Sequence, residues 1–304
     1  MTVVRGRRLW ALVAVTAVAV AAIAAGAALL LGGGDDGGAH AASRGPALAW
    51  APPRLHAPQT IHVTAARAKL KLDPRRDYRV VLPRTPVRVA GGLTIAGGRN
   101  VVVRGGQVVV PWQGARPASG STRRGLFLTG QTGTVHVEGL RLSGDLGDGI
   151  DLDERLGATV QLENIRVDRV TARDTKKFSD THPDVVQSWA GPKVLRIDRL
   201  SAATDYQGFF LLPDQFAKGT TARVDLRHVD LVGSRTSAYL LWRDRAAAVT
   251  LRDVRLTSPG ARPVYQTMWP TPAWWPGARV IRHAPRTLFA SPRAGISYTS
   301  PGYR

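Results

Sequence analysis

The sequence predicts an all-β protein: a single-stranded parallel β-helix, or solenoid, with a cap at each end and a hydrophobic helix at the N-terminus. Three observations lead to this prediction. One template of alternating apolar positions recurs along the chain. A second short strand-like run follows each copy. From residue 59 to residue 268 the short runs are broken by Gly, Pro and Asp, and no segment keeps a 3.6-residue period over three turns.

The N-terminal sequence predicts export. Arg5, Arg7 and Arg8 precede an uncharged apolar stretch at residues 10–31. A membrane-spanning helix needs about 20 apolar residues, whereas the apolar region of a signal peptide has about 7–15. The length therefore favours an uncleaved signal anchor, but AHA at residues 39–41 has the form of a cleavage site. The basic flank places the rest of the chain outside the cytoplasm, anchored by this helix or secreted.

These boundaries predict a signal peptide or signal-anchor helix at 1–31, a Gly- and Pro-rich linker at 32–58 and one β-helix domain at 59–304. The formal net charge is +20, from 42 Lys and Arg against 22 Asp and Glu. This balance is typical of an arginine-rich composition or of attraction to polyanions. No helix-turn-helix, zinc-finger or aromatic RNA-binding signature occurs, so nucleic acid is not expected as a partner. Cysteine is absent, which excludes disulfides and thiolate chemistry.

The first strand of each coil follows the template apolar, x, apolar, polar, x, apolar, x, apolar. The copies are VVVRGGQV (101–108, the loosest), VHVEGLRL (135–142), VQLENIRV (160–167), LRIDRLSA (195–202), VDLRHVDL (224–231) and VTLRDVRL (249–256). Their starts are 25 to 35 residues apart, and the longer intervals indicate looped-out insertions. A coil of about 25 residues cannot bury its own apolar face, whereas stacked coils bury it and pair each strand with neighbours on both sides.

The second strand of each coil is predicted at GLFL (125–128), GIDLD (149–153), DVVQS (184–188), GFFLL (208–212), AYLLW (238–242) and PVYQT (263–267). An antiparallel sandwich is the alternative, but it requires hairpin turns, and GDG at 147–149 is the main such signal. Residues before Val101 are expected to form the N-terminal cap. The segment from Trp269 is expected to cover the last coil, with Trp274 and Trp275 packing there, because an uncovered coil end is an aggregation-prone edge.

Three segments at coil spacing, NVVVRGGQVVV, DGIDLD and HPDVVQ, resemble the right-handed parallel β-helix, or pectate lyase-like, superfamily over residues 93–267. The resemblance implies a right-handed solenoid. The superfamily includes lyases, hydrolases, uronate epimerases and non-catalytic binding proteins. GDGIDLD resembles the TDGID strand of polygalacturonases, which implies Asp148 or Asp151 as catalytic. The later Asp-Asp, Gly-His-Gly and Arg-Ile-Lys motifs of that family have no counterpart, so polygalacturonase activity is not expected.

Strict alternation of side chains along the second strands predicts which residues share a face. The inward residues are then aligned as Ile150, Val185, Phe209, Tyr239 and Val264. In this register Asp151 and Asp184 face outward on adjacent coils. Adjacent coils are about 4.8 Å apart. Aromatic rings follow further along the same face, so the face combines carboxylates with flat apolar surfaces, as a sugar-binding groove requires. The expected substrate-binding residues are Asp151, Asp153, Gln187, Phe210, Trp242 and Tyr265.

Three chemistries fit this groove. Paired carboxylates can hydrolyse a glycosidic bond. Acidic residues on neighbouring coils can hold Ca²⁺, the candidate cofactor, which takes hard oxygen ligands. A metal-free lyase or epimerase can use a base, an acid and a cation that neutralises a uronate, and DTHPD resembles the His-Asp pairing of uronate epimerases. The expected catalytic residues are His182 as base, Tyr206 as acid, Asp184, and Lys177 (or Lys176) and Arg243 as cations, with no residue assigned as a metal ligand.

The leading expectation is a polysaccharide lyase, with glycoside hydrolase and uronate epimerase as alternatives. Structural roles stay open for four of these residues: Asp148 and Asp151 can cap turns, Gln187 can bond a neighbouring turn from an inward position, and His182 is held extended before Pro183. The rival function is a non-catalytic surface protein that binds anionic cell-wall or capsular polymer. The expected partners are a polysaccharide, acidic or neutral, and the membrane through the N-terminal helix, and the chain is expected to be a monomer.

Overall fold

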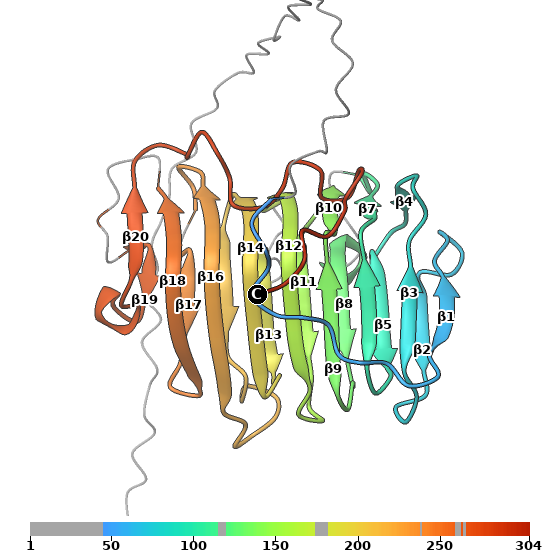
Figure 1. The fold of residues 1–304 in the computed structure, drawn as a ribbon. Helices are drawn as coiled ribbons and strands as arrows, with labels where there is room; N and C mark the ends of the chain where they lie inside the picture. The colour runs from blue at the N-terminus through green and yellow to red at the C-terminus, as the bar shows by residue number, and fades with distance from the viewer. Residues whose placement is uncertain (1–44, 115–119, 174–181, 238, 259–262, 264–265) are drawn as a thin grey trace, which may run out of the picture. The chain divides into compact units, whose positions relative to one another are not determined.

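The computed structural model describes residues 45–304 except 115–119, 174–181, 238, 259–262 and 264–265. This part of the chain is all-β, with two sheets of parallel strands and essentially no helix, which confirms the all-β, parallel-stranded part of the predicted fold class. Figure 1 shows the strands stacked side by side in chain order, as expected for a parallel β-helix. The predicted N-terminal helix lies outside the described residues. Within them, the search for an apolar helix of membrane-crossing length finds none.

Along the chain, one strand or a pair of short strands in the 12-stranded sheet alternates with one strand in the 8-stranded sheet. The 12-stranded sheet consists of β1 (Gln59–His62), β3 (Tyr78–Val81), β4 (Val87–Arg88), β6 (Val101–Arg104), β7 (Gln107–Val110), β9 (Thr134–Glu138), β10 (Arg141–Gly144), β12 (Thr159–Val170), β14 (Val194–Thr204), β16 (Ala222–Gly233), β18 (Ala247–Thr257) and β20 (Ala278–Ile281), counted over the described residues. The 8-stranded sheet, counted likewise, consists of β2 (Lys69–Leu72), β5 (Leu93–Gly97), β8 (Arg124–Thr129), β11 (Asp148–Asp153), β13 (Asp184–Ala190), β15 (Gln207–Leu211), β17 (Leu241–Arg243) and β19 (Met268–Trp269). Two short 3₁₀ helices, η1 (Gly120–Arg123) and η4 (Pro272–Trp274), complete the described elements.

The six template copies stack in register. Their first residues, Val101, Val135, Val160, Leu195, Val224 and Val249, pair as direct neighbours across the 12-stranded sheet. The unassigned fifth position of the template is a bend in left-handed conformation, with φ of 55° at Asn164 and 49° at His228, and with glycine at this position in the two earliest copies. The apolar positions on both sides of the bend can therefore face the interior, because the strand turns there.

The interior is one apolar cluster between the sheets. Its clearest column runs through the 8-stranded sheet as Leu93, Leu126, Ile150, Val186, Phe209, Leu241 and Met268, each at most 3% exposed. Glycine is required where coils approach closely beside this column. A Cβ on Gly208 would lie 2.2 Å from the Leu240 carbonyl oxygen and 2.7 Å from Leu231 Cδ1.

The N-terminal end differs from the predicted cap. Residues before Val101 continue both sheets, since Tyr78 of β3 pairs with Val101 and Leu93 of β5 pairs with Leu126. At the other end, β19 and β20 add strands beyond β17 and β18. Trp275 is 1% exposed in the core, in agreement with its expected packing role.

Two extended terminal segments cross the outer face of the 12-stranded sheet. Leu48, which lies in the predicted linker, is fully buried and bridges to Tyr303. The Ala49 amide donates to Asp198 Oδ2 at 3.0 Å. The C-terminal segment returns from β20 toward β9, and the Tyr298 hydroxyl donates to Glu138 Oε1 at 2.5 Å. Figure 1 shows both segments, blue and red, lying over the middle of this sheet.

Candidate functional site

The stacking register of the 8-stranded sheet decides which side chains meet on its outer face. Ile150 pairs with Val186, and Asp151 pairs with Gln187, which in turn pairs with Phe210. The predicted register, which aligned Ile150 with Val185, is therefore wrong by one residue. Val185 instead stacks at a bend, because a Cβ on Gly149 would lie 2.5 Å from the Val185 carbonyl oxygen.

Two consecutive residues, Val185 and Val186, face the interior at this bend. The polar residues Asp184 and Gln187 flank them on both sides. Gln187 is consequently on the outer face with Asp151, not inside as predicted. One outer column contains Arg124, Asp148, Asp184 and Gln207, and the other contains Phe127, Asp151, Gln187, Phe210, Trp242 and Trp269. The register thus brings Asp148, Asp151 and Asp184 together.

The three carboxyl groups have few compensating contacts. Asp151 and Asp184 are both 0% exposed, and the Asp184 carboxylate oxygens have no hydrogen-bond partner within the described part of the chain. Asp151 forms an ion pair with Arg124. The backbone amide of Asp184 donates to Asp148 Oδ1 at 3.1 Å, which orients Asp148 toward the Asp184 coil. Buried carboxyls without partners are costly, which favours either a proton on them or a polar ligand beside them.

Burial and mutual repulsion raise all three pKa values. Burial raises the pKa of Asp148 to about 6, against the opposing effects of the Asp184 amide and Arg124. Burial raises the pKa of Asp184 well above its ordinary 3.8, and the charges of Asp148 and Asp151 add to this. Burial and Asp148 raise the pKa of Asp151 in the same way, although Arg124 opposes them. The environments therefore favour an ionised Asp148 beside a protonated Asp184 near neutral pH.

His182 and Tyr206 lie next to this cluster, as predicted. Their rings are stacked, with centroids 6.1 Å apart and planes at 22°. His182 is exposed and Tyr206 is partly buried. Burial raises the pKa of Tyr206 to about 12, with a further contribution from the Asp184 charge. The phenol is therefore a neutral hydroxyl group over the physiological range and a weaker acid than an ordinary tyrosine, which disfavours its predicted role as the acid.

Aromatic rings flank the carboxyls on both sides of the stack. On one side, Phe127 and Trp189 lie 6.0 Å apart, with the Arg124 guanidinium 4.8 Å and 5.4 Å from their ring centroids. On the other side, the ring centroids of Phe210 and Trp242 are 5.6 Å apart, and those of Trp242 and Trp269 are 5.2 Å apart. Tyr239, which was predicted to face inward, packs edge-on against Trp242 at 5.1 Å. Trp269 is 41% exposed, so this aromatic row reaches solvent.

The remaining predicted site residues do not join the cluster or cannot be placed. The Arg243 guanidinium lies over the rings of Trp274 and Trp275, 4.9 Å and 5.3 Å from their centroids, and donates to the Trp274 carbonyl at 2.5 Å. Arg243 therefore packs the last coils instead of facing the carboxyls. Asp153 is paired with Arg155 at 2.7 Å. Lys177, with Lys176, and Tyr265 lie outside the described residues.

The carboxyls do not provide a three-ligand metal site. Within the described residues, no group of three His, Asp or Glu side chains has an arrangement that could hold a metal ion. The expected calcium chemistry therefore has no such donor set among these residues.

Sequence reasoning missed Arg124, Phe127 and Trp189 as members of the site. Arg124 and Phe127 lie on either side of the GL pair of the second strand GLFL, and Trp189 follows DVVQS directly. The position of Arg124 and Phe127 relative to the bend at residues 125–126 is the signal that could have found these two. Both the residue before the bend and the residue after it face outward. Comparisons of the chain with protein-family models, with curated proteins and with solved structures found no match.

Proposed function

We propose that this protein is an exported right-handed parallel β-helix of the pectate lyase-like type that cleaves glycosidic bonds of an extracellular polysaccharide. The observation that supports this most is the cluster of Asp148, Asp151 and Asp184 on the outer face of one sheet, in which Asp151 and Asp184 are fully buried and aromatic rings lie alongside. Export rests on the apolar N-terminal stretch of the sequence.

The pKa values suggest acid and nucleophile roles. Asp184, whose pKa burial raises well above 3.8, would donate its proton to the glycosidic oxygen and release the leaving sugar. Asp148, ionised above about pH 6, would attack the anomeric carbon as the bond to the leaving sugar breaks, and a water molecule that gives its proton back to Asp184 would then hydrolyse the glycosyl-enzyme bond. Asp151, held by Arg124, would raise the pKa of Asp184 and accept hydrogen bonds from sugar hydroxyls.

The position of the two carboxyls suggests a stereochemical outcome. Asp148 and Asp184 lie at equivalent positions on paired strands, and paired strands are about 4.8 Å apart. Retaining glycosidases place their carboxyls about 5–5.5 Å apart, whereas inverting enzymes separate them by about 6.5–9.5 Å. Retention of configuration at the anomeric carbon is therefore the expected result.

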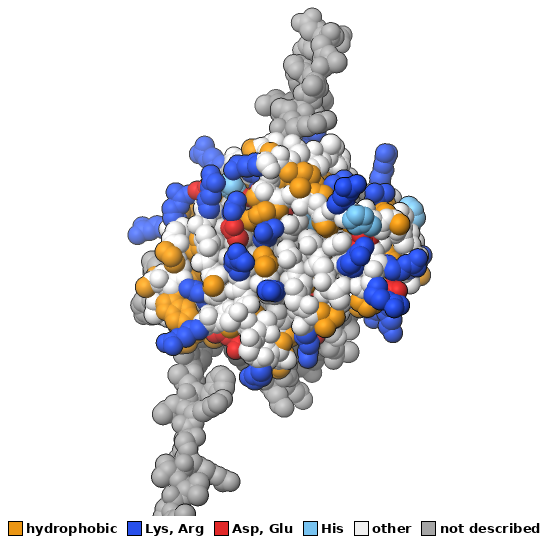
Figure 2. All heavy atoms as spheres, turned by 60° about the horizontal axis from the view of Figure 1, so that its bottom comes forward, with side chains coloured by type: hydrophobic (Ala, Val, Ile, Leu, Met, Phe, Trp, Pro, Cys, Tyr) orange, Lys and Arg blue, Asp and Glu red, His pale blue; other side chains and the backbone are white. Residues whose placement is uncertain are grey.

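The charge of the site favours a neutral or weakly charged glycan. Three carboxyls against one arginine repel a polyuronate unless two of them are protonated. The aromatic row Phe210, Trp242 and Trp269 offers apolar ring surfaces for pyranose rings over successive coils. Lys and Arg side chains in Figure 2 are spread over the face in view, which fits an arginine-rich composition.

The test is a screen of the full chain on neutral and uronate-containing polysaccharides, with the release of reducing ends as the readout. Asp148→Asn and Asp184→Asn should each lose about 10²–10⁴-fold in kcat/KM. Asp168→Asn is the matched control, because Asp168 pairs with Arg141 at 2.7 Å on the other sheet.

Three outcomes would contradict the proposal. Unsaturated end groups that absorb in the near ultraviolet would indicate a lyase. Undiminished rates in both Asn variants would exclude this site. Salt-sensitive binding of anionic polymer with no turnover of any glycan would favour the non-catalytic alternative.

A further inference from the structure

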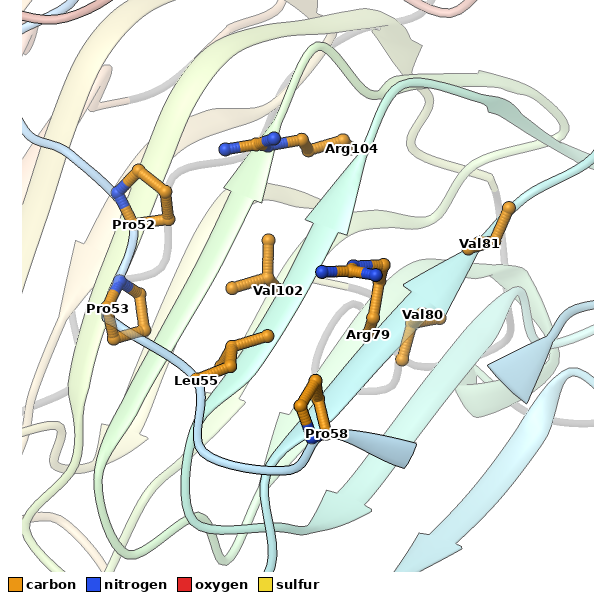
Figure 3. Close-up of a pocket in the computed structure, with 9 residues that line it drawn as sticks. All are labelled: Pro52, Pro53, Leu55, Pro58, Arg79, Val80, Val81, Val102 and Arg104. Atoms are coloured by element: carbon orange, nitrogen blue, oxygen red, sulfur yellow. The ribbon is translucent and has the colours of Figure 1, made fainter. Parts of the chain in front are cut away.

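A pocket of about 460 Å³ lies on the other sheet, between the terminal segment that contains Pro52–Pro58 and the outer face of β3 and β6. Figure 3 shows the guanidinium groups of Arg79 and Arg104 extending over Val102 into the space bordered by Pro53 and Leu55. The acidic cluster described above lies on the 8-stranded sheet, so this pocket is independent of the proposed function.

The pocket has a fixed wall and an apolar floor. Val102 is 6% exposed and forms the floor. The wall segment is held on both sides, since the Ala49 amide donates to Asp198 at 3.0 Å and the His56 amide donates to Asp77 at 2.7 Å. Prolines at positions 52, 53 and 58 restrict its backbone further. The cavity therefore exists before any ligand arrives, and its volume falls within the range of about 300–1,000 Å³ that is usual for small-molecule sites.

The two arginines concentrate positive charge in this cavity. Arg79 has no ion-pair partner among the residues that the structure describes. Arg104 is 3.6 Å from Glu138 Oε2 and 3.3 Å from the Tyr303 hydroxyl, so its charge is only partly compensated. In the register of β3 with β6, Arg79 pairs with Val102 and Arg104 pairs with Val81. The two arginines are thus diagonal neighbours, about 8 Å apart by strand spacing and rise.

We propose that this pocket binds an oxyanion, a phosphate or carboxylate group, carried on a body the size of one or two sugar units. Because the Cα atoms of the two arginines are about 8 Å apart, their long side chains can bring both guanidinium groups to a single phosphate or carboxylate, which are the groups that arginine binds through its paired N–H donors. The apolar floor and the proline wall accommodate the carbon skeleton of the ligand. Phosphate and carboxylate sources share this chemistry, and the experiment separates them.

The experiment is titration calorimetry of the full chain at low salt with glycerol 3-phosphate and with galacturonic acid, and with glycerol and galactose as uncharged probes. At least one anion should bind with an affinity that falls as salt rises, and the uncharged probes should not bind. Arg79→Gln should weaken that binding at least tenfold. Arg88→Gln is the matched control, because Arg88 is exposed on β4 and does not line the pocket, and it should bind as the wild type does.

Binding of only one probe assigns the anion. The proposal is overturned if neither anion binds. It is overturned equally if Arg79→Gln and Arg88→Gln weaken binding to the same extent, because the basic surface as a whole would then account for it.

Discussion

The column of buried carboxyls under the terminal segments predicts that Glu163→Gln stabilises the protein at neutral and alkaline pH. Glu163 pairs in register with Glu138 on one side and Asp198 on the other, and all three side chains are at most 1% exposed. Both Glu163 oxygens are buried, and the backbone amides of Ala49 and Trp50 lower the pKa of this carboxyl only in part. Burial, followed by the charges of Asp198 and Glu138, raises the pKa of Glu163 from 4.5 to about 9.

The sign and size of the effect follow from this shift. Between pH 4.5 and pH 9 the folded state keeps a proton on Glu163 that the unfolded state has lost, so stability falls as pH rises. Each unit of pKa difference corresponds to about 1.4 kcal/mol, which gives a cost of about 3 kcal/mol at pH 7 as an upper estimate. Glutamine has the same shape, carries no proton to lose and can donate to the neighbouring carboxylates. The variant should therefore gain about 1–3 kcal/mol at pH 7.

The assay is denaturant unfolding of wild type and variant at pH 5, 7 and 8.5. The stability difference should be small at pH 5 and should grow with pH, and other groups with raised pKa values cancel in this comparison. Glu138→Gln is the control of opposite sign. Burial raises the pKa of Glu138, but hydrogen bonds from His136, Tyr298 and Tyr303 outweigh burial and hold the pKa at about 2, so its loss should destabilise the fold at pH 7. A stability difference between wild type and Glu163→Gln that does not change with pH would refute the reasoning.

Three further predictions concern the core, the bend in the first strands and the site. Phe209→Ala should lower the free energy of unfolding by about 3–5 kcal/mol in the same assay, because the ring is fully buried; a change below 1 kcal/mol would contradict the stacked core. Gly139→Ala should loosen the C-terminal segment, since the new Cβ would lie 2.0 Å from Tyr298 Cδ1, and limited proteolysis should then cleave after residue 285 faster than in wild type. The pH profile of kcat/KM should rise through about pH 6 with ionisation of Asp148 and fall at higher pH as Asp184 loses its proton; a rise near pH 4 would exclude Asp148 as the nucleophile.

The repeat in the sequence was sufficient to predict the fold class and the alignment of the first strands. Template copies align residue for residue, as in the pairing of Val160 with Val135 and Leu195, because their apolar alternation specifies which face is buried. The second strands were less predictable. DVVQS contains adjacent valines, and both are fully buried, since Val185 stacks at the bend and Val186 stacks on Ile150. The alternation of apolar and polar residues cannot show which of the two valines stacks on Ile150. That stacking determines whether Gln187 faces inward or outward.

Site residues could be predicted where they lie on neighbouring coils of the repeat. Contacts between segments that are distant in the sequence could not be predicted. Asp184 beside Tyr206 followed from coil order alone. The contact between Arg124 and Asp151 depended on the exact register, and the packing of Arg243 under Trp274 depended on how the chain folds back after β19. Contacts of the C-terminal segment, such as Tyr298 with Glu138, join residues that no local pattern relates.

The bridge between Leu48 and Tyr303 also determines where the folded unit would first yield to mechanical force. The chain reaches β1 only after residues 45–58 have crossed the sheet, so tension applied at residue 45 acts first on this bridge and then on the bond from Ala49 to Asp198. Peeling of the terminal segments would precede the loss of any coil. Under such tension, the released terminal segment would lengthen while the stacked coils stay intact.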